Sequence, residues 1–434
     1  MSTLLILPNT LFQKKYIPDG ITEIIVWEHP QYFTKYKYNK KRIVLHRASM
    51  QYYFNQHKTD GKYSLQYCEF NKKPKVPKEY LYFDPIDRIK LPPGCIKIES
   101  PNFLLSTELL QEYHKKTKSF FFNGFYMWAK NKLGIIPDIK SQDKKNRKAL
   151  PNGTKLPPLS PLSKDDKKYI KEAEQYVEKN FPKNYGTAVD LAFPVTHTTA
   201  KKWLTQFISK KLKHFGDYQD YTLQDEHYMF HSCLSSSINI GMLNPAEIIT
   251  DLEKVKSKIP MNSYEGLIRQ YFWREYQRYC YIYLDEWHGT NYFGNTIKLS
   301  KKWYNGTTGI DPVDDAIRDG FDTGYLHHIR RLMIVANYMN LCGINHEQGR
   351  RWFTEFALDS YDWVMYQNLD MGFFASGGKT SRKPYVSSSN YVIKMSNYTK
   401  GDWSATWDNL YRDFIKKNKQ KLWKYRYHFP TLKN

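Results

Sequence analysis

Two adjacent histidines, His327 and His328, are the residues of this sequence whose types and spacing point most directly to chemistry. They lie in the segment GYLHHIRRLM, whose apolar positions predict a helix. Neighbouring side chains on a helix point about 100° apart, so we expect that the pair cannot easily share one metal ion. The pair is either one core histidine beside one that points elsewhere, or a proton donor next to a cofactor. Taken alone, the two residues favour ordinary core packing.

Hydroxyl groups gather in a second segment, HSCLSSSINIG, which runs from His231 to Gly241 shortly after FGDYQD. Hydroxyls and free backbone N–H groups at such turns suit a phosphate or a pyrophosphate. The alternative is that these serines only cap a helix.

A row of polar side chains crosses an aromatic helix at IRQYFWREYQR. Gln270, Arg274 and Arg278 recur every four residues and therefore lie on one face. Burying such a row is costly unless a ligand or partner charges meet it. The alternative is a stripe exposed to solvent.

Aromatic and basic residues supply two more candidates. Trp303 and Trp352 flank the histidines in sequence and either relay electrons to a redox cofactor or simply pack. The loop SGGKTSRKPYVSSSNY carries positive charge and ends in Tyr385 and Tyr391, which suits a nucleic-acid strand with an unstacked base. Its glycines lack phosphate-loop spacing, which excludes a nucleotide triphosphatase of that type.

Composition narrows the class of protein. The chain has 434 residues, and its 66 Lys and Arg against 43 Asp and Glu favour a polyanionic partner, nucleic acid before a membrane surface. Five separated cysteines without a CxxC pair indicate neither a disulfide framework nor a metal cluster. No apolar run of about 18 residues predicts a membrane span. We therefore expect an intracellular, reduced protein without a membrane anchor.

The pattern of elements predicts two unequal domains. Residues 1–116 carry short strand-like runs at 3–8, 22–28, 64–70, 79–83 and 95–99, with one long helix candidate over 41–58. Short, proline-rich connections between the later strands predict a reduced α/β sheet. Residues 117–185 form a basic, proline-rich linker with helices. Residues 186–434 are mostly helical, with helices expected at 247–258, 264–285, 313–342, 346–366 and 403–417, and with a first helix capped by Thr198 and ended by Gly216.

In this order, the motifs resemble the cryptochrome and photolyase superfamily, and within it the iron-sulfur bacterial cryptochromes and photolyases, also called prokaryotic (6-4) photolyases. The anchors are FGDYQD, HSCLSSSINIGML, IRQYFWREY, GYLHHIRRLM, RRWFTEFALDSYDWV and KPYVSSSNYVIKMSNY, which span about residues 120 to 411. The resemblance implies a reduced Rossmann-like N-terminal domain of the antenna type and a larger, all-α catalytic domain that binds FAD.

The resemblance also implies roles for particular residues. FAD would be bound by Gly216, Asp217, Tyr218, Ser232, Leu234, Ser235, Asn239, Arg274, Arg331, Asp359 and Asp362. Catalysis would involve His327, His328, Tyr385, Tyr391 and Gln270, electron transfer would involve Trp352 and Trp303, and DNA would contact Lys379, Arg382 and Lys383. A cation beside the flavin stabilises its anionic reduced form, and a carboxylate orients that cation.

The implied activity is light-driven repair of (6-4) pyrimidine-pyrimidone photoproducts, with a histidine that protonates the extruded lesion. Gln270 stands where cyclobutane-dimer photolyases carry Glu, which favours the (6-4) substrate over a cyclobutane dimer. The alternatives are a cryptochrome-like blue-light photoreceptor that binds FAD without repair, and a nucleic-acid-binding protein without flavin. The expected partner is damaged DNA with a flipped lesion, bound by a monomer that is cytoplasmic or nucleoid-associated and encoded by a cell or a virus.

Three departures from the family pattern carry further expectations. Thr399, Asp402 and Ala405 stand where the cluster cysteines are expected, so we predict that the iron-sulfur cluster is absent and that the chain has no metal site. Pro8, Asn9 and Thr10 replace the antenna motif, so an antenna chromophore is doubtful. Phe353 follows Trp352 where the branch often has Tyr, so we expect slow photoreduction through Trp352 and Trp303, or photoreduction by another route.

Overall fold

Five short parallel strands form the sheet at the amino-terminal end of the protein. The structure is a computed structural model that describes residues 2–284, 290–429 and 432. The strands are β1 (Ser2–Ile6), β2 (Ile21–Trp27), β3 (Ser64–Cys68), β4 (Tyr80–Phe83) and β5 (Cys95–Ile98), in the order β3-β2-β1-β4-β5. Each adjacent pair is parallel. All five strands predicted from the sequence are therefore confirmed, and the sheet is as small as the short connections indicated.

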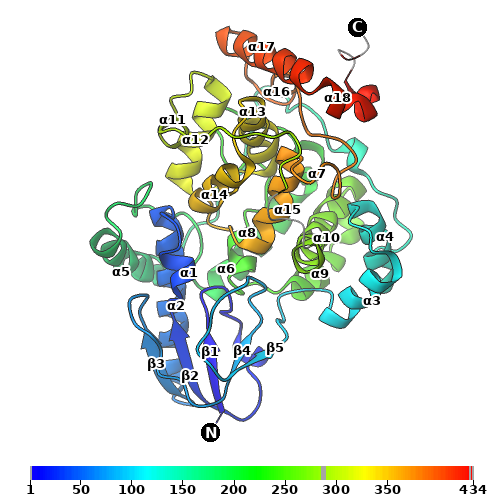
Figure 1. Ribbon diagram of the computed structural model, residues 1–434. Coiled ribbons are helices and arrows are strands. Elements are labelled where there is room, and N and C mark those ends of the chain that lie inside the picture. Colours follow the sequence, from blue (N-terminus) through cyan, green and yellow to red (C-terminus); the bar gives the residue numbers. More distant parts are fainter. Residues whose placement is uncertain (1, 285–289, 430–431, 433–434) are drawn as a thin grey trace.

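A long helix runs beside the strands, and the other helices lie beyond the upper end of the sheet in Figure 1. The long helix α2 (Lys40–Asp60) begins at Asn39, whose side chain accepts a hydrogen bond from the N–H of Lys41. The short helix α1 (Pro30–Phe33) precedes it. Helix α5 (Lys164–Asn180) packs against α2, and Arg47 of α2 pairs with Glu172 of α5 at 2.7 Å and with the buried Glu28, just after β2, at 2.9 Å. Part of the predicted linker thus packs on the N-terminal domain.

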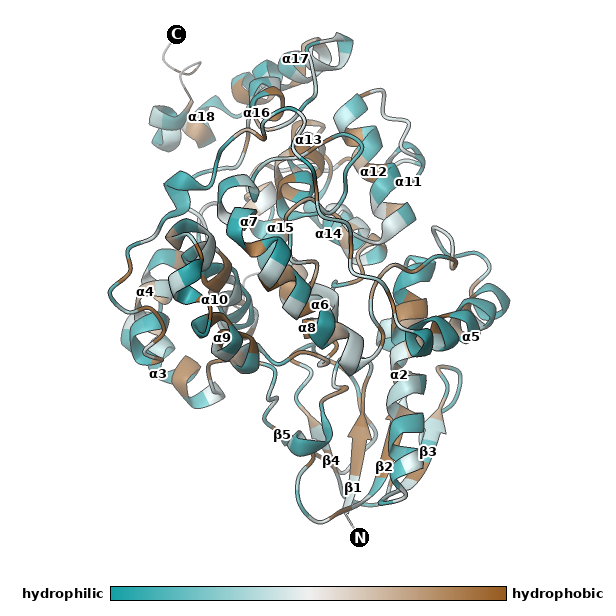
Figure 2. Cartoon of the chain, turned by 180° about the vertical axis from the view of Figure 1, so that it is seen from behind, coloured by the Kyte–Doolittle hydropathy of each residue, from teal (hydrophilic) through white to brown (hydrophobic). Residues whose placement is uncertain are grey.

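The rest of the described chain is helical and lies above the carboxyl ends of the strands in Figure 1. Its elements are α3 (Thr107–Thr117), α4 (Phe122–Lys132), α6 (His197–Lys210), α7 (Leu212–Tyr218), α8 (Ser235–Asn239), α9 (Pro245–Glu253), α10 (Met261–Tyr283), α11 (Lys302–Asn305), α12 (Asp311–Thr323), a π-helical segment (Arg330–Ala336), α13 (Asn337–Leu341), α14 (His346–Phe356), α15 (Asp362–Phe373), α16 (Ser389–Lys394), α17 (Asp402–Lys417) and α18 (Lys419–Leu422). Helix α10 is central and packs on α4, α7 and α15. Colouring by hydropathy shows apolar residues on β1, β2 and the inner helices and polar residues outside (Figure 2).

Helix boundaries differ from the expected ones at several positions. The helix expected at 313–342 is three elements, because Gly324 adopts a φ of 70° and ends α12. A Cβ at Gly324 would lie 2.6 Å from the Cγ of Leu358, so the turn requires glycine. Thr196 rather than Thr198 caps α6, and Gly216 lies inside α7 rather than at a helix end. Residue 285 of the helix expected at 264–285 lies outside the described residues.

The proposed boundary at residue 116 falls inside α3, and α4 of the expected linker packs on α10 of the helical domain. Within the part of the chain that the structure describes, no helix is long and apolar enough to cross a membrane.

Candidate functional site

A cavity of about 610 Å³ lies inside the helical region. Its walls come from the turn after α7, the start of α8, one face of α10, the segment 325–333, helix α15 and the loop 383–391. A volume of this size is typical of sites for large organic ligands, which occupy roughly 300–1,000 Å³. The sequence-predicted residues that line it are His327, His328, Tyr385, Tyr391, Gln270, Ser232, Ser235, Asn239, Arg274, Arg331, Asp359 and Lys383.

Two arginines and their partners form one hydrogen-bonded network in the cavity wall. The guanidinium of Arg331 donates from Nη2 to both carboxylate oxygens of Asp359, at 3.0 and 3.2 Å. Asn239 donates to the backbone oxygen of Asp359 at 3.0 Å and accepts from Nε of Arg274 at 3.0 Å. Residues from α8, α10, the π-helical segment and the loop before α15 are therefore fixed relative to one another.

Arg274 makes this wall suitable for an anion. Burial lowers the pKa of its guanidinium to about 10, and within the described residues its Nη2 has no hydrogen-bond partner. Ser232, in the turn before the adjoining α8, and Ser235, its first residue, also line the cavity. Buried donors of this kind are nearly always satisfied, so their arrangement fits a bound ligand with negatively charged oxygens.

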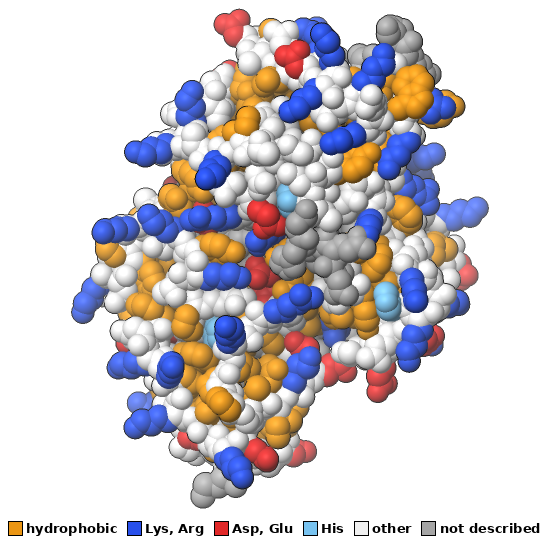
Figure 3. Space-filling model, in the orientation of Figure 1, with side chains coloured by type: hydrophobic (Ala, Val, Ile, Leu, Met, Phe, Trp, Pro, Cys, Tyr) orange, Lys and Arg blue, Asp and Glu red, His pale blue; other side chains and the backbone are white. Residues whose placement is uncertain are grey.

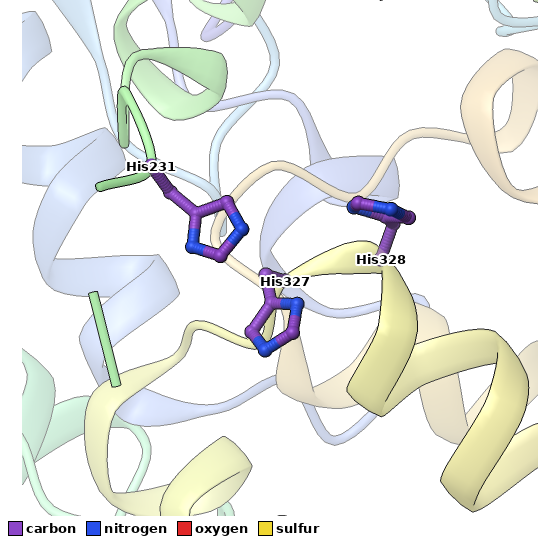
Figure 4. A group of neighbouring side chains, drawn as sticks. All are labelled: His231, His327 and His328. Carbon is purple, nitrogen blue, oxygen red and sulfur yellow. The ribbon is translucent and has the colours of Figure 1, made fainter. Parts of the chain in front are cut away.

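Three histidines of the cavity lining, His231, His327 and His328, lie together (Figure 4). His327 lies just before the helix and His328 begins it, so the 100° spacing of helical neighbours does not apply to them. Their ring nitrogens and those of His231 offer ligand atoms that all lie within 4.8 Å of one another. The expectation that this pair could not easily share one metal ion rested on the geometry of a continuous helix, which the chain does not form here.

The two predicted histidines have different surroundings. His327 is buried, its ring stacks on that of His231 with centroids 4.4 Å apart, and the planes differ by 18°. Burial, followed by the nearby His231, holds the pKa of His327 well below its usual range. His328 is 42% exposed, and its Nε2 donates to Oδ1 of Asp220 at 3.0 Å. His327 is consequently neutral, whereas the ring of His328 is held by a carboxylate.

The two predicted tyrosines stand near this pair. Tyr385 and Tyr391 line the cavity from the loop and the start of α16. Burial raises the pKa of both hydroxyls, and the nearby Asp220 raises that of Tyr391 further. Both hydroxyls therefore remain protonated at neutral pH and can donate hydrogen bonds.

Several predicted cofactor residues do not line the cavity. Asp217 faces the linker, where it pairs with Lys148 at 3.0 Å, and the ring of Tyr218 lies 5.7 Å from that of Phe230. Leu234 is fully buried beneath α8. Asp362 pairs with Lys35 of the N-terminal region at 3.0 Å. The motif spacing placed these residues close to the cavity, but their side chains point to neighbouring contacts.

Gly216 likewise has a packing role. A Cβ there would lie 2.5 Å from the N of Ser263 on α10, so glycine allows α7 and α10 to approach. We expect Gly216→Ala to lower the free energy of unfolding by about 1–3 kcal/mol through overpacking, measured by urea denaturation. Gly124→Ala is the matched control, because its Cβ would meet only the Tyr113 hydroxyl, at 3.4 Å. Equal stability of the two variants would contradict this packing role.

The predicted electron-transfer residues lie behind the cavity wall. Phe353 lines the cavity, and its ring centroid is 4.9 Å from that of Trp352. Trp352 is fully buried and donates from Nε1 to the backbone oxygen of Trp303 at 2.6 Å. The two tryptophans are therefore in contact, and a phenylalanine separates them from the cavity.

Sequence reasoning missed part of the site. Asp143 and Arg147 come from the linker and line the cavity, where Asp143 pairs with Arg269 at 3.1 Å. Asp220 and His231 also line it. Asp220 belongs to the motif FGDYQD and His231 to HSCLSSSINIG. Only the contacts of Asp220 with His328 and of His231 with His327 show that the two residues belong to the site. Of the predicted DNA-contacting residues, Lys383 lines the cavity, and Lys379 and Arg382 precede it on the same loop.

Two family models match the chain. The one described as the FAD binding domain of DNA photolyase matches residues 267–428. The one described as deoxyribodipyrimidine photo-lyase-related protein matches residues 4–84 and 76–193.

Individual proteins are also similar. A (6-4) photolyase of Agrobacterium fabrum is 34% identical over 343 residues, which cover 74% of this chain and 67% of the relative. An uncharacterised protein of Acanthamoeba polyphaga mimivirus is 55% identical over 92 residues, covering 21% of this chain and 75% of that protein. The crystal structure of a bacterial class III photolyase from Agrobacterium tumefaciens superposes with a TM-score of 0.57 at 14% identity, covering 96% of this chain and 86% of that one.

Proposed function

Because this chain belongs to the photolyase and cryptochrome family, we propose that it is a light-driven DNA repair enzyme that reverses (6-4) photoproducts. The observation that carries this proposal is the pairing of His328 with Asp220 at the mouth of a cavity whose wall suits an anionic cofactor. A proton donor and a buried cofactor site thus open onto the same space.

The cavity fits FAD, and different residues of its wall would contact different parts of the cofactor. Arg274, Ser232 and Ser235 would meet the pyrophosphate. Arg331, oriented by Asp359, would lie near the flavin ring. When bound and reduced, FAD supplies the electron that light makes available. Fixed arginines at a water-poor site favour the anionic reduced form, because a nearby cation stabilises negative charge.

At the mouth, the side chains would bind a flipped base and move one proton. His328, backed by Asp220, is the candidate donor, because a carboxylate stabilises the charged ring. His327 is neutral and buried, and it would shape the pocket. Tyr385 and Tyr391 present protonated hydroxyls and aromatic faces on which an unstacked base can lie.

Gln270 also lines this cavity, where its neutral amide would face the lesion. The (6-4) photolyase relative supports the (6-4) photoproduct as the substrate. The alternatives are repair of a cyclobutane dimer and a signalling role without repair, and the following test distinguishes them. The mimivirus relative supports a viral source for the chain.

The test is repair of defined lesions. The flavin-loaded, reduced protein is illuminated with an oligonucleotide that carries a single (6-4) photoproduct, and separately with one that carries a cyclobutane dimer. We expect the (6-4) photoproduct to be converted back to normal pyrimidines and the cyclobutane dimer to remain. Chromatography of the digested oligonucleotides measures both. Repair of only the dimer would overturn the lesion assignment, and light-dependent flavin chemistry without any repair would favour a photoreceptor.

DNA binding should depend on the basic loop beside the cavity. Lys and Arg side chains are spread over the face in Figure 3, so the loop is distinguished by its place rather than by its charge alone. We expect Lys383→Gln and Arg382→Gln each to reduce the slope of log affinity against log salt by about 0.9, because each removes one phosphate contact. Binding is measured by fluorescence anisotropy at several salt concentrations.

The control for this measurement is Lys62→Gln, which removes an exposed cation from the end of α2 in the N-terminal region. Its slope should equal that of the unaltered protein. A loss of affinity that is the same at every salt concentration would contradict phosphate contact by the loop.

The absence of an iron-sulfur cluster stays a prediction, as does the doubt about an antenna. The five cysteines are Cys68, Cys95, Cys233, Cys280 and Cys342, and four thiolates would have to converge on one cluster. We expect less than one iron atom in ten protein molecules by elemental analysis, on the order of background for an unbound metal. Stoichiometric iron with a cluster absorption band would contradict it.

A further inference from the structure

We propose that His231, His327 and His328 form a binding site for a divalent transition-metal ion such as Zn²⁺, which competes with the lesion for the mouth of the cavity (Figure 4). One ligand nitrogen from each ring lies within 4.8 Å of the others. Three neutral imidazoles with an open fourth position are a known arrangement for a zinc ion that exchanges ligands. The competition rests on the proposed function, whereas metal binding does not.

Hydrogen bonds behind two of the rings leave one nitrogen free on each. The Nε2 of His231 donates to the backbone oxygen of Gln219 at 3.0 Å, and that of His328 donates to Asp220 at 3.0 Å. When the two rings are neutral, Nε2 carries the proton in both, so Nδ1 keeps its lone pair. Carbonyl and carboxylate acceptors behind metal-binding histidines orient the ring in this way and increase its basicity.

The third ring, that of His327, is buried, and within the described part of the chain no hydrogen bond fixes its orientation. Neither nitrogen of His327 has a hydrogen-bond partner among the described residues, although the side chain is 4% exposed, and Nδ1 of His231 is also unpartnered. Buried polar atoms without a partner are rare and often mark the place of an ion or a ligand.

The stacking of two rings limits the strength of the site. Zn²⁺ needs nitrogens at about 2.0–2.1 Å, which places ligand atoms roughly 3.4 Å apart in a tetrahedron. The rings of His231 and His327 are stacked 4.4 Å apart with 18° between their planes, so one ion cannot lie in both planes. At least one ring must turn, and the adjoining cavity gives it room. We therefore expect reversible binding, on the order of micromolar rather than nanomolar.

Calorimetry in the dark, without DNA, tests the site directly. The flavin-loaded protein is freed of metal with a chelator and titrated with Zn²⁺. We expect one site per chain, and at least about tenfold weaker binding for His231→Phe and for His328→Asn, because each removes a ligand. His231→Phe keeps an aromatic ring against His327, and His428→Asn, an exposed residue near the carboxyl end, is the control and should bind normally.

No Zn²⁺ binding below about 1 mM, or binding by both variants as tight as that of the unaltered protein, would overturn the proposed site. If His231→Phe fails to fold, as judged by circular dichroism, the half-exposed His328→Asn decides the question.

A repair assay then tests the competition. We expect Zn²⁺ to inhibit repair and a chelator to restore it, in proportion to occupancy of the site. Zn²⁺ binding without inhibition would overturn the competition alone. Absence of repair in metal-free protein would count against the proposed function, while the calorimetric result for the histidines would stand.

Discussion

Replacement of His328 by alanine is expected to lower the yield of (6-4) repair per absorbed photon by about 100- to 10,000-fold, the range for loss of a general acid. The ring is the one histidine of the pair that faces solvent and is held by a carboxylate, at 3.0 Å from Asp220. Without it, no imidazole held by a carboxylate would stand at the cavity mouth. The measurement is lesion repair under continuous light, with absorbed photons counted by actinometry.

Two comparisons separate proton donation from loss of structure. Flavin content should be unchanged in His328→Ala, because the ring lies at the mouth and not in the wall of arginines. His327→Ala should reduce repair less, since a neutral ring contributes shape and not a proton. A larger defect in His327→Ala than in His328→Ala would reverse the assignment of the donor.

Loss of Arg331 is expected to have the second large effect, on cofactor binding. Arg331→Leu leaves the carboxylate of Asp359 with no cation, and both side chains of this pair are 13% exposed. Breaking a buried pair from one side costs about 3–5 kcal/mol, which also lowers affinity for any anion that the guanidinium meets. We expect at least about tenfold weaker reconstitution with FAD, measured by recovery of flavin absorbance on the apoprotein.

Arg351→Leu is the matched control for this variant. Arg351 pairs with Glu355 at 2.8 Å on α14 and does not line the cavity. Its loss should reduce stability without weakening flavin binding. If both variants bound FAD equally well, Arg331 would have only a structural role. Substituting Lys for Arg331 should not restore binding, because the guanidinium donates to Asp359 from Nη2 and to the backbone oxygen of Leu326 from Nε at 2.6 Å, and one ammonium cannot fill both positions.

The sequence alone predicted the fold class and much of the cavity wall. Strand residues were found because a parallel sheet is buried on both faces, which makes β1 and β2 nearly continuous apolar runs. Arg274, Asn239, Arg331 and Asp359 were found because they belong to contiguous motifs, and their hydrogen bonds join the motifs in space. Apolar runs and contiguous motifs can be recognised in the sequence without knowledge of the tertiary contacts.

The sequence did not show which residues at the end of α7 reach the cavity. Gly216, Asp217 and Tyr218 were placed at the cofactor, yet the cavity is reached by Gln219 and Asp220, the next two residues. A motif gives the position of a turn along the chain but not the direction of each side chain, which packing against α10 and the linker decides.

For the histidine pair, too, the sequence identified the residues and the tertiary structure decided their separate roles. Its residue types, and the motifs around it, were enough to identify a candidate for proton transfer. Only the tertiary structure separated the two rings, because Gly324 ends one helix before them and breaks the periodicity that a continuous helix would impose. Burial against His231 makes His327 neutral, and the turn after α7 brings Asp220 to His328. These contacts join residues about a hundred positions apart, so no local pattern could encode them.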